Sequence, residues 1–370
     1  MMFKGSKGPT SVSSNLSTSL LKARNVGTAS PFLEGRHAGW ELGLPEYIER
    51  SADLAKPPII IAVGGGKGGV GKSLVSANLA VRLSGSGVRV LAIDLDIGGA
   101  NLHTYFGQGS PPYNLADAIV YGRKNLQDVI IPSGIAGVSL IAGGGEEAWG
   151  GASSMHDGTL RKLFQAIFSL KRLGLADIVI LDLGAGTHRH TLDFFAAAHH
   201  GLLTVLPEPT SIENAYLFLK TSLLRLVENI GNNLGLPDVA GIARRHLLGG
   251  EGAASGGTTR AIGYSDKLRY LAHEHPAFIQ HVRLALASRT LGITINQVRG
   301  QKDIDVGKSM ELIGERYFGF QSRYCGYLNY DEAAWKSLRN RRLLVVDFPH
   351  SVLSQRFTEL ARIVLTNLGY

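Results

Sequence analysis

Cysteine is almost missing from this sequence, since Cys325 is the single cysteine among 370 residues. One cysteine cannot form an internal disulfide, and it cannot hold an iron–sulfur cluster within one subunit. Scarce cysteine is typical of reducing compartments. We therefore expect Cys325 to be a small buried residue beside a strand, and the sequence argues against a disulfide-stabilised secreted domain and against a carrier of metal clusters.

Long hydrophobic runs are missing as well. The apolar runs at residues 59–63 and 178–181 have the length of strands, whereas a membrane-spanning helix needs roughly 18 to 20 apolar residues. Residues 1–19 have neither the apolar core of a secretory signal nor the Arg-rich pattern of a transit peptide. These absences predict a soluble, cytoplasmic protein, and a peripheral place at the membrane stays open.

Acidic residues are fewer than basic ones, because 30 Asp and Glu stand against 38 Lys and Arg, a net charge of +8. Such an excess attracts acidic surfaces, so nucleic acid and an anionic membrane surface are both open as partners. The basic residues are spread along the chain, however. Their densest cluster, Arg339, Arg341 and Arg342, is equally explained as a solvated face of the fold.

Residues 1–56 mix Ser, Gly and Pro with little periodic apolar content, which predicts a poorly ordered N-terminal tail. From residue 57 onward, apolar strand-like runs alternate with helical segments. This alternation predicts one α/β domain over residues 57–370, with a mostly parallel central sheet flanked by helices on both faces. The expected strands are residues 59–63, 88–93, 138–142, 178–182, 202–206 and 293–298.

One stretch is too long for an ordinary helix and short loop between two strands. It lies between Lys220 and the strand at residues 293–298, and it contains a Gly/Ser-rich patch at residues 249–259 and a helical run at residues 266–286. We therefore expect a partly helical and partly flexible insertion at residues 225–290.

A glycine-rich loop at residues 64–73 joins the first strand to a segment with helical spacing. This order forms a phosphate cradle, because glycines let backbone N–H groups curl around phosphates and the helix N-terminus adds a favourable dipole. Lys72 is expected to neutralise the β- and γ-phosphates, and the Ser73 hydroxyl to ligate Mg²⁺. The expected nucleotide-binding residues are Gly66, Lys67, Gly68, Gly69, Val70, Gly71, Lys72 and Ser73.

A second lysine, Lys67, makes this loop resemble the deviant Walker A loop of the MinD/ParA superfamily. The resemblance implies a three-layer P-loop NTPase fold, ATP as the nucleotide, and an ATP-dependent homodimer in which Lys67 contacts phosphate in the partner's site. Charge develops on the phosphoryl oxygens during transfer, so a cation from the second subunit couples hydrolysis to dimerisation. In arginine-finger enzymes such a group is worth roughly 10³ to 10⁵ in rate.

Carboxylates follow two of the expected strands. Asp94 and Asp96 lie two positions apart at one strand end, and the C-terminal edge of strands is where ligands bind in open α/β sheets. The resemblance assigns Asp96 to orienting the attacking water, Asp94 to the magnesium neighbourhood, and the Walker B-like Asp182 to holding Mg²⁺ through water. It also assigns Asn296 to reading adenine, for which a solvated strand-end asparagine is the alternative.

Asn101, the turn at residues 183–186 and the strand exit at residues 206–211 resemble the FlhG/FleN flagellar-number branch of the superfamily. The resemblance implies a slow, partner-stimulated ATPase that acts as a dimerisation switch. Such a switch regulates the number or placement of a cellular structure such as flagella, together with a regulatory protein partner. The alternative is a ParA-like partition ATPase that binds nucleoid DNA, and salt-sensitive, ATP-dependent DNA binding would separate the two.

The C-terminal residues 357–368 have the apolar stripe of a helix, with Arg356 and Arg362 as the nearby basic residues. Relatives that bind membranes use a C-terminal amphipathic helix rich in basic residues. Because this segment has so few of them, we expect it to pack on the sheet, and no clear membrane-targeting helix is identified.

Overall fold

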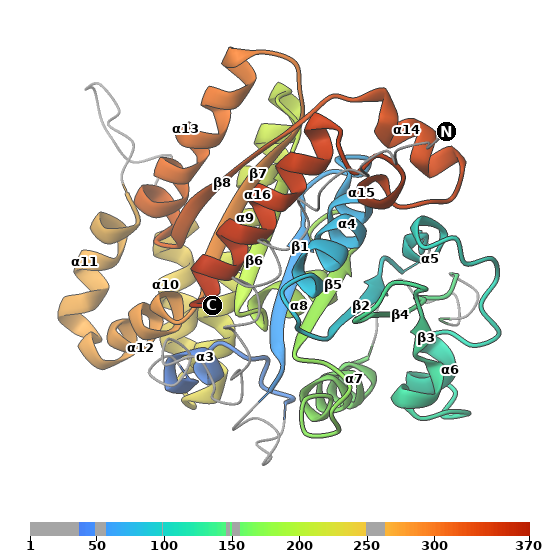
Figure 1. Cartoon of the computed structure of the whole chain (residues 1–370). Helices are drawn as coiled ribbons and strands as arrows, with labels where there is room; N and C mark the ends of the chain where they lie inside the picture. The colour runs from blue at the N-terminus through green and yellow to red at the C-terminus, as the bar shows by residue number, and fades with distance from the viewer. Residues whose placement is uncertain (1–36, 49–56, 98, 146–148, 150–155, 249–262) are drawn as a thin grey trace, which may run out of the picture.

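An eight-stranded sheet in the order β3-β4-β2-β5-β1-β6-β7-β8 forms the centre of the structure. The computed structural model describes residues 37–48, 57–97, 99–145, 149, 156–248 and 263–370 (Figure 1). Neighbouring strands run parallel, except that β3 and β4 are antiparallel. The strands are β1 Ile59–Gly64, β2 Val90–Leu95, β3 Ile131–Pro132, β4 Val138–Ile141, β5 Ile178–Leu183, β6 His200–Val205, β7 Thr290–Val298 and β8 Gln321–Asn329.

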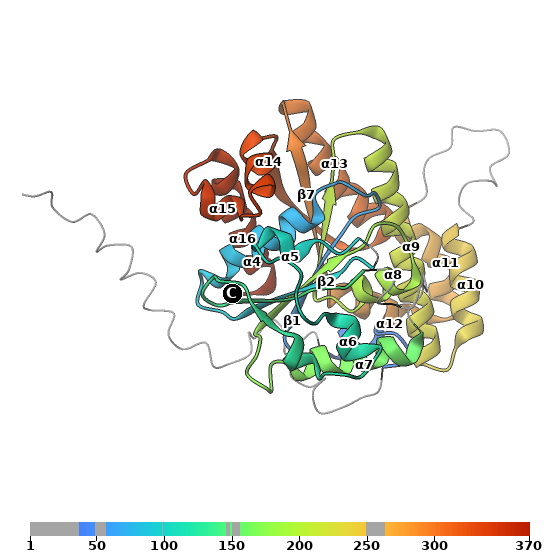
Figure 2. The ribbon, with the colours of Figure 1, turned by 90° about the vertical axis from the view of Figure 1, so that its right-hand side faces the viewer.

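Helices cover both faces of the sheet, so the predicted three-layer α/β fold is confirmed. Figure 2 shows α4 and α16 on one side of the strands and α7, α8 and α9 on the other. The helices of the first side are α4 Lys72–Ser84, α5 Leu102–Tyr105, α14 Glu332–Arg339, α15 Leu344–Asp347 and α16 Val352–Leu368. Those of the second side are α3 His37–Leu42, α6 Leu115–Ile119, η3 Leu126–Val129, α7 Asp157–Ser169, α8 Arg189–Ala196, α9 Pro209–Asn233, α10 Pro237–Leu248, α11 Tyr264–Glu274, α12 Pro276–Ala287 and α13 Gln301–Phe318.

The central strands β1, β2 and β5 are mostly apolar because both of their faces are buried. Successive side chains of a strand point to opposite faces. Ile59, Ile61 and Val63 of β1 accordingly pack in the core that contains α4 and α16. Ile60 and Ala62 pack in the core that contains α7, α8 and α9. This arrangement holds β1 rigidly at the centre of the sheet, directly before the glycine loop.

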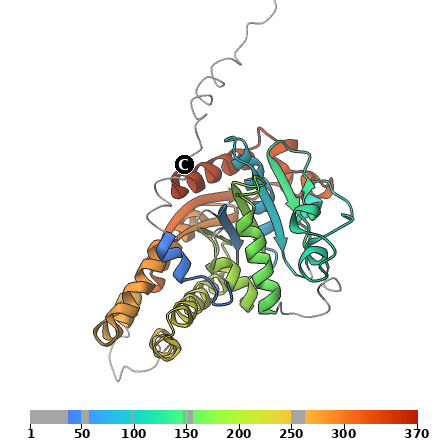
Figure 3. The same ribbon diagram turned by 90° about the horizontal axis from the view of Figure 1, so that it is seen from below.

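Residues 37–48 depart from the expected poorly ordered tail. They contain the helix α3, and Trp40, Leu44 and Tyr47 are buried in the core. Figure 3 shows α3, in blue, beside an orange helix of the second layer. The helix that α3 contacts is α12. Burial of these three side chains therefore fixes residues 37–48 in the fold, although the surrounding sequence is polar. Residues 1–36 and 49–56, the rest of the predicted tail, lie outside the described residues.

The predicted insertion at residues 225–290 begins inside α9, which continues to Asn233. The helices α10, α11 and α12 follow, and they pack on α9, α13 and one another. Residues 249–262, which contain the Gly/Ser-rich patch, lie outside the described residues. The helical part of this stretch therefore extends the second layer of helices.

The C-terminal helix α16 packs against β8 and α4, as predicted. Its apolar stripe, which includes Phe357, Leu360 and Val364, is buried. Cys325 of β8 is buried in the same core, also as predicted. Among the described helices, none is both long and apolar enough to cross a membrane.

Candidate functional site

The glycine loop turns sharply between β1 and α4. Gly69 and Gly71 have φ angles of 77° and 94°, in the left-handed region that disfavours residues with a Cβ. Gly71 is the N-cap of α4 and provides no side-chain cap, so the first N–H groups of the helix remain for an anion. Lys72 is the first residue of α4 and its side chain is mostly buried. These donors and this cation fit a chain of phosphates.

Two glycines of the loop are also required by close packing. A Cβ at Gly66 would collide with the backbone carbonyl of Asn214 in α9, and one at Gly71 would collide with the side-chain amide of Asn296. The loop therefore lies pressed between α4, α9 and the end of β7. Its backbone is held in place by the fold, which preorganises the phosphate cradle.

Asp94 and Asp182 lie side by side at the C-terminal edge of the sheet. They are register partners in the parallel pair β2–β5, and both are fully buried. Burial raises the pKa of Asp94, and the negative charge of Asp182 raises it further. The Asp94 carboxylate accepts hydrogen bonds from the backbone N–H of Asp96 at 3.1 Å and of Leu102 at 2.9 Å. Asp94 thereby fixes the segment that carries Asp96 and begins α5.

Asp182 is placed beside the start of α4. Its Oδ1 accepts a hydrogen bond from the Ser76 hydroxyl at 2.8 Å, while its buried Oδ2 finds no hydrogen-bond partner among the described residues. Burial raises the pKa of Asp182, and hydrogen bonds from Ser73 and Ser76 together with the charge of Lys72 oppose this rise. A carboxylate oxygen without a partner, next to hydroxyl groups, is the oxygen-rich environment that Mg²⁺ prefers.

The structure brings Ser73 and Asp182 together, as the predicted Mg²⁺ site requires, with Asp94 next to Asp182. Among the described residues there is no group of three or more His, Cys, Asp or Glu side chains that could hold a metal ion by themselves. A Mg²⁺ ion at this place would therefore depend on Ser73, on water held by Asp182, and on phosphate oxygens of the nucleotide.

Asp96 lies where β2 leaves the sheet, against the turn that follows β5. A Cβ added at Gly184 would lie 2.9 Å from Oδ1 of Asp96, so any other residue there would force the Asp96 carboxylate to shift. Gly184 therefore lets the carboxylate of Asp96 approach the turn after Asp182. The role of Asp96 in orienting an attacking water stays a prediction.

Lys67 differs from Lys72 in that its side chain reaches out of the loop. The Lys67 side chain is 39% exposed. Its ammonium group donates to the Thr210 hydroxyl at 3.1 Å and to Glu208 Oε2 at 3.4 Å, both at the N-terminal end of α9. Within one subunit, Lys67 is thus held beside the loop by α9 and not directed at its own phosphate cradle.

Asn296, the predicted adenine reader, connects the end of β7 to the glycine loop. Its Nδ2 donates to the carbonyl oxygen of Val70 at 2.8 Å, and its Oδ1 accepts from the N–H of Gln297 at 2.8 Å. Gln297 has a φ of 58°, which is uncommon for a residue other than glycine and is often found at functional sites. Asn296 therefore stabilises the glycine loop through its hydrogen bond to Val70, and its contact with adenine stays a prediction.

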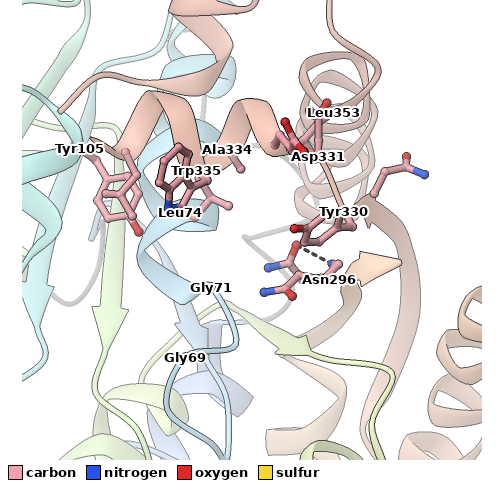
Figure 4. A pocket seen from close by; sticks show the side chains of 14 residues that line it. Gly69, Gly71, Leu74, Tyr105, Asn296, Tyr330, Asp331, Ala334, Trp335 and Leu353 are labelled. Carbon is pink, nitrogen blue, oxygen red and sulfur yellow. Dashed lines mark hydrogen bonds between the residues drawn. The ribbon is translucent and has the colours of Figure 1, made fainter. Parts of the chain in front are cut away.

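A pocket of about 610 Å³ opens beside the loop, within the size range of small-molecule sites. Figure 4 shows Leu74 and Trp335 at one end of it and Asn296 and Tyr330 at the other. Gly69 and Gly71 also line the pocket. A nucleotide whose phosphates occupy the glycine loop would place its nucleoside here.

Several residues of this site are absent from the sequence-based prediction. Ser76 lies one helical turn after Ser73, and it is a buried serine on the face of α4 that packs against the sheet. Tyr330 and Trp335 gave no signal, because an aromatic residue at a strand exit or in a short helix is ordinary. Glu208 also required the structure, since its contact with Lys67 spans 141 positions.

A glycine loop between a central parallel strand and a helix, with a buried lysine and buried carboxylates at the neighbouring strand ends, defines a P-loop nucleotide-binding protein. The chain belongs to the CobQ/CobB/MinD/ParA nucleotide binding domain family, whose family model matches residues 61–344.

Two curated relatives carry names connected with flagella. The antiactivator FleN of Pseudomonas aeruginosa is 39% identical over 165 residues, which are 44% of this chain and 56% of the relative. The flagellum site-determining protein YlxH of Helicobacter pylori is 36% identical over 161 residues, 43% of this chain and 52% of the relative. The chain thus spans about half the length of the curated relatives it matches.

Solved structures agree on the fold. The cell division ATPase MinD of Pyrococcus furiosus has a TM-score of 0.54 at 21% identity, covering 83% of this chain and 98% of that chain. The septum site-determining protein MinD of Pyrococcus horikoshii, solved with Mg-ADP, has a TM-score of 0.53 at 20% identity, covering 85% of this chain and 99% of that chain. At these identities the likeness concerns the fold alone.

Proposed function

We propose that this protein is an ATP-hydrolysing dimerisation switch that regulates the number or placement of a cellular structure such as flagella. The observation that carries the proposal is the position of Lys67, which is exposed beside the loop while Lys72 occupies the buried position at the start of α4. A cation in this place is available to the phosphates of a second subunit. The names of the relatives FleN and YlxH support a flagellar role.

Each residue of the site has a distinct task in this proposal. Lys72 and the loop N–H groups bind the phosphates, Asp96 orients a water, and Lys67 of one subunit stabilises charge in the site of the other. Mg²⁺, held by Ser73 and through water by Asp182, would neutralise charge on the phosphate oxygens. Because hydrolysis serves timing, turnover is slow until a regulatory protein partner accelerates it.

The test measures ATP hydrolysis and particle mass for the wild type, Lys67→Ala and Asp96→Ala. We expect the wild type to dimerise with ATP and to hydrolyse it. We expect Asp96→Ala to dimerise but to hydrolyse at least about tenfold more slowly, and Lys67→Ala to lose both properties. Lys308→Ala, which removes an exposed lysine on α13, is the matched control. Full hydrolysis by both site variants would defeat the proposal.

DNA partition in the manner of ParA is the second candidate function. It is favoured by the net charge of +8 and by the exposure of Arg339, Arg341 and Arg342 where α14 gives way to α15. ATP-dependent DNA binding that weakens steeply with salt would support it. Membrane attachment has less support, since the apolar stripe of α16 is already buried.

A further inference from the structure

Two aromatic residues at the pocket are unusually open to solvent. Tyr330 and Trp335 are 51% and 60% exposed, yet both line the pocket beside the glycine loop. We call them the aromatic pair. Large aromatic side chains bury much apolar area when they find a partner, so their exposure at a ligand-sized pocket indicates a role toward the ligand.

An arginine guanidinium lies over each ring of the aromatic pair. The guanidinium of Arg299 lies 3.9 Å from the ring centroid of Tyr330, and that of Arg339 lies 5.2 Å from the ring centroid of Trp335. A cation over one face holds an aromatic ring in place and leaves the other face for stacking. Both rings are thus oriented although the fold does not bury them.

The place of Trp335 relative to the loop is informative. Figure 4 shows its indole next to Leu74 of α4 and Tyr105, at the side of the pocket formed by the start of the phosphate-binding helix. Leu74 follows Lys72 by two positions. The nucleoside of a nucleotide whose phosphates lie on the glycine loop would therefore lie against the side of the pocket formed by Leu74 and Trp335. The amide of Asn296 is meanwhile engaged with Val70 and Gln297.

We propose that Trp335, assisted by Tyr330, stacks on the base of the bound nucleotide and supplies most of the affinity for a purine. Trp335 is then a specificity-determining residue, which favours purine over pyrimidine nucleotides because the larger ring system stacks better. This inference rests on the proposed function, since it takes the loop to bind the phosphates of ATP.

The test uses tryptophan fluorescence and equilibrium binding, without hydrolysis. Trp40 and Trp149 are buried and Trp335 is not, so quenching by ADP reports on Trp335. In Trp335→Phe we expect the quenching to vanish while calorimetry finds the affinity for ADP within threefold of the wild type. In Trp335→Leu we expect ATP and ADP to bind about tenfold more weakly, while inorganic tripolyphosphate binds unchanged. Tyr330→Leu should show a smaller loss of the same kind.

Tyr113→Leu is the matched control, because Tyr113 is also exposed and also has a cation, Lys124, over its ring. It should bind all three ligands like the wild type. Unchanged ATP affinity in Trp335→Leu would overturn the stacking proposal, even if dimerisation were reduced. In that case, loss of ATP and tripolyphosphate binding by Lys72→Ala would leave the proposed function intact. A wild type that binds neither ligand would overturn both.

Discussion

Asn296 donates a hydrogen bond from Nδ2 to the carbonyl oxygen of Val70, 2.8 Å away and 226 positions earlier in the chain. The bond is buried and joins the end of β7 to the middle of the glycine loop. Gly71 lets the amide approach, because any Cβ there would collide with it. The shape of the phosphate cradle therefore depends on a residue that the sequence suggests only as a contact to adenine.

Replacing Asn296 should accordingly weaken binding of the phosphates as well as of the base. In Asn296→Ala the carbonyl of Val70 loses its donor, which costs about 1–3 kcal/mol for a buried polar group. We expect about tenfold weaker binding of ATP, ADP and also tripolyphosphate by calorimetry. Asn296→Asp keeps the size but cannot donate, and it should behave similarly. Unchanged tripolyphosphate binding would show that Asn296 serves the base alone.

Glu208 restrains Lys67 within its own subunit, so removing its charge should favour the dimer. Both side chains are partly exposed, and exposed ion pairs are worth only about 0.2–1 kcal/mol. We therefore expect Glu208→Gln to lower the dimer dissociation constant about two- to fivefold with a non-hydrolysable ATP analogue, measured by analytical ultracentrifugation. The effect should shrink at high salt.

Glu213→Gln, at an exposed position one turn further along α9, controls for the general loss of a negative charge. It should leave the dimer constant unchanged. A weaker dimer in Glu208→Gln alone would contradict the restraint, because it would place Glu208 among the groups that hold the two subunits together.

The sequence was sufficient for the central strands and the glycine loop, since both are local patterns. β1 and β5 are buried on both faces, and residues 59–63 and 178–181 in them are continuous apolar runs. β8 was missed because it lies at the edge of the sheet, where exposed Gln321 and Arg323 interrupt the pattern. Residues 37–48 were misjudged because averaging over a Ser- and Gly-rich stretch hides the anchors Trp40 and Tyr47.

For the site, the sequence could name residues but not their partners. Lys67, Asp96 and Asp182 follow from motif positions. The bond from Ser76 to Asp182 and the contact between Lys67 and Thr210 join residues 106 and 143 positions apart. Such pairings depend on how the strands are ordered in the sheet, which a single sequence does not specify.

The buried carboxylates predict how stability depends on pH. Burial raises the pKa of Asp94 and of Asp182 above the ordinary value of 3.8. A raised pKa means that the folded state favours the protonated form. The stability that these groups contribute is therefore complete below pH 3.8 and is lost as pH rises through their raised pKa values.

We expect the free energy of unfolding of the nucleotide-free protein to fall more steeply from pH 5 to pH 8 than that of Asp94→Asn. The difference should be about 1–3 kcal/mol over this range, because a one-unit pKa shift corresponds to about 1.4 kcal/mol. Urea titrations at several pH values measure it. Asp305→Asn, on the surface of α13, is the control. Parallel profiles for wild type and Asp94→Asn would contradict the prediction.

Trp40 should matter for stability and not for nucleotide binding. Its ring stacks on His199 with centroids 4.4 Å apart, and its Nε1 donates to the carbonyl oxygen of Ala197 at 3.1 Å. Trp40→Ala should lower the free energy of unfolding by about 3–5 kcal/mol, because it empties a buried site of a large side chain. Trp335→Ala should change it by less than about 0.5 kcal/mol, because that residue is exposed.

Urea denaturation and ADP calorimetry of both Trp40→Ala and Trp335→Ala separate the effect on stability from the effect on nucleotide binding. Trp40→Ala should unfold at much lower urea but bind ADP within about twofold of the wild type while folded, since Trp40 packs on Ala197 and His199 directly before β6. Because β6 runs parallel to β1, this is the end of the strands opposite to the glycine loop. Tyr47→Phe, which removes only the hydrogen bond to Asp193, should cost about 1 kcal/mol. An unchanged urea midpoint in Trp40→Ala would mean that residues 37–48 are not a structural part of the domain in solution.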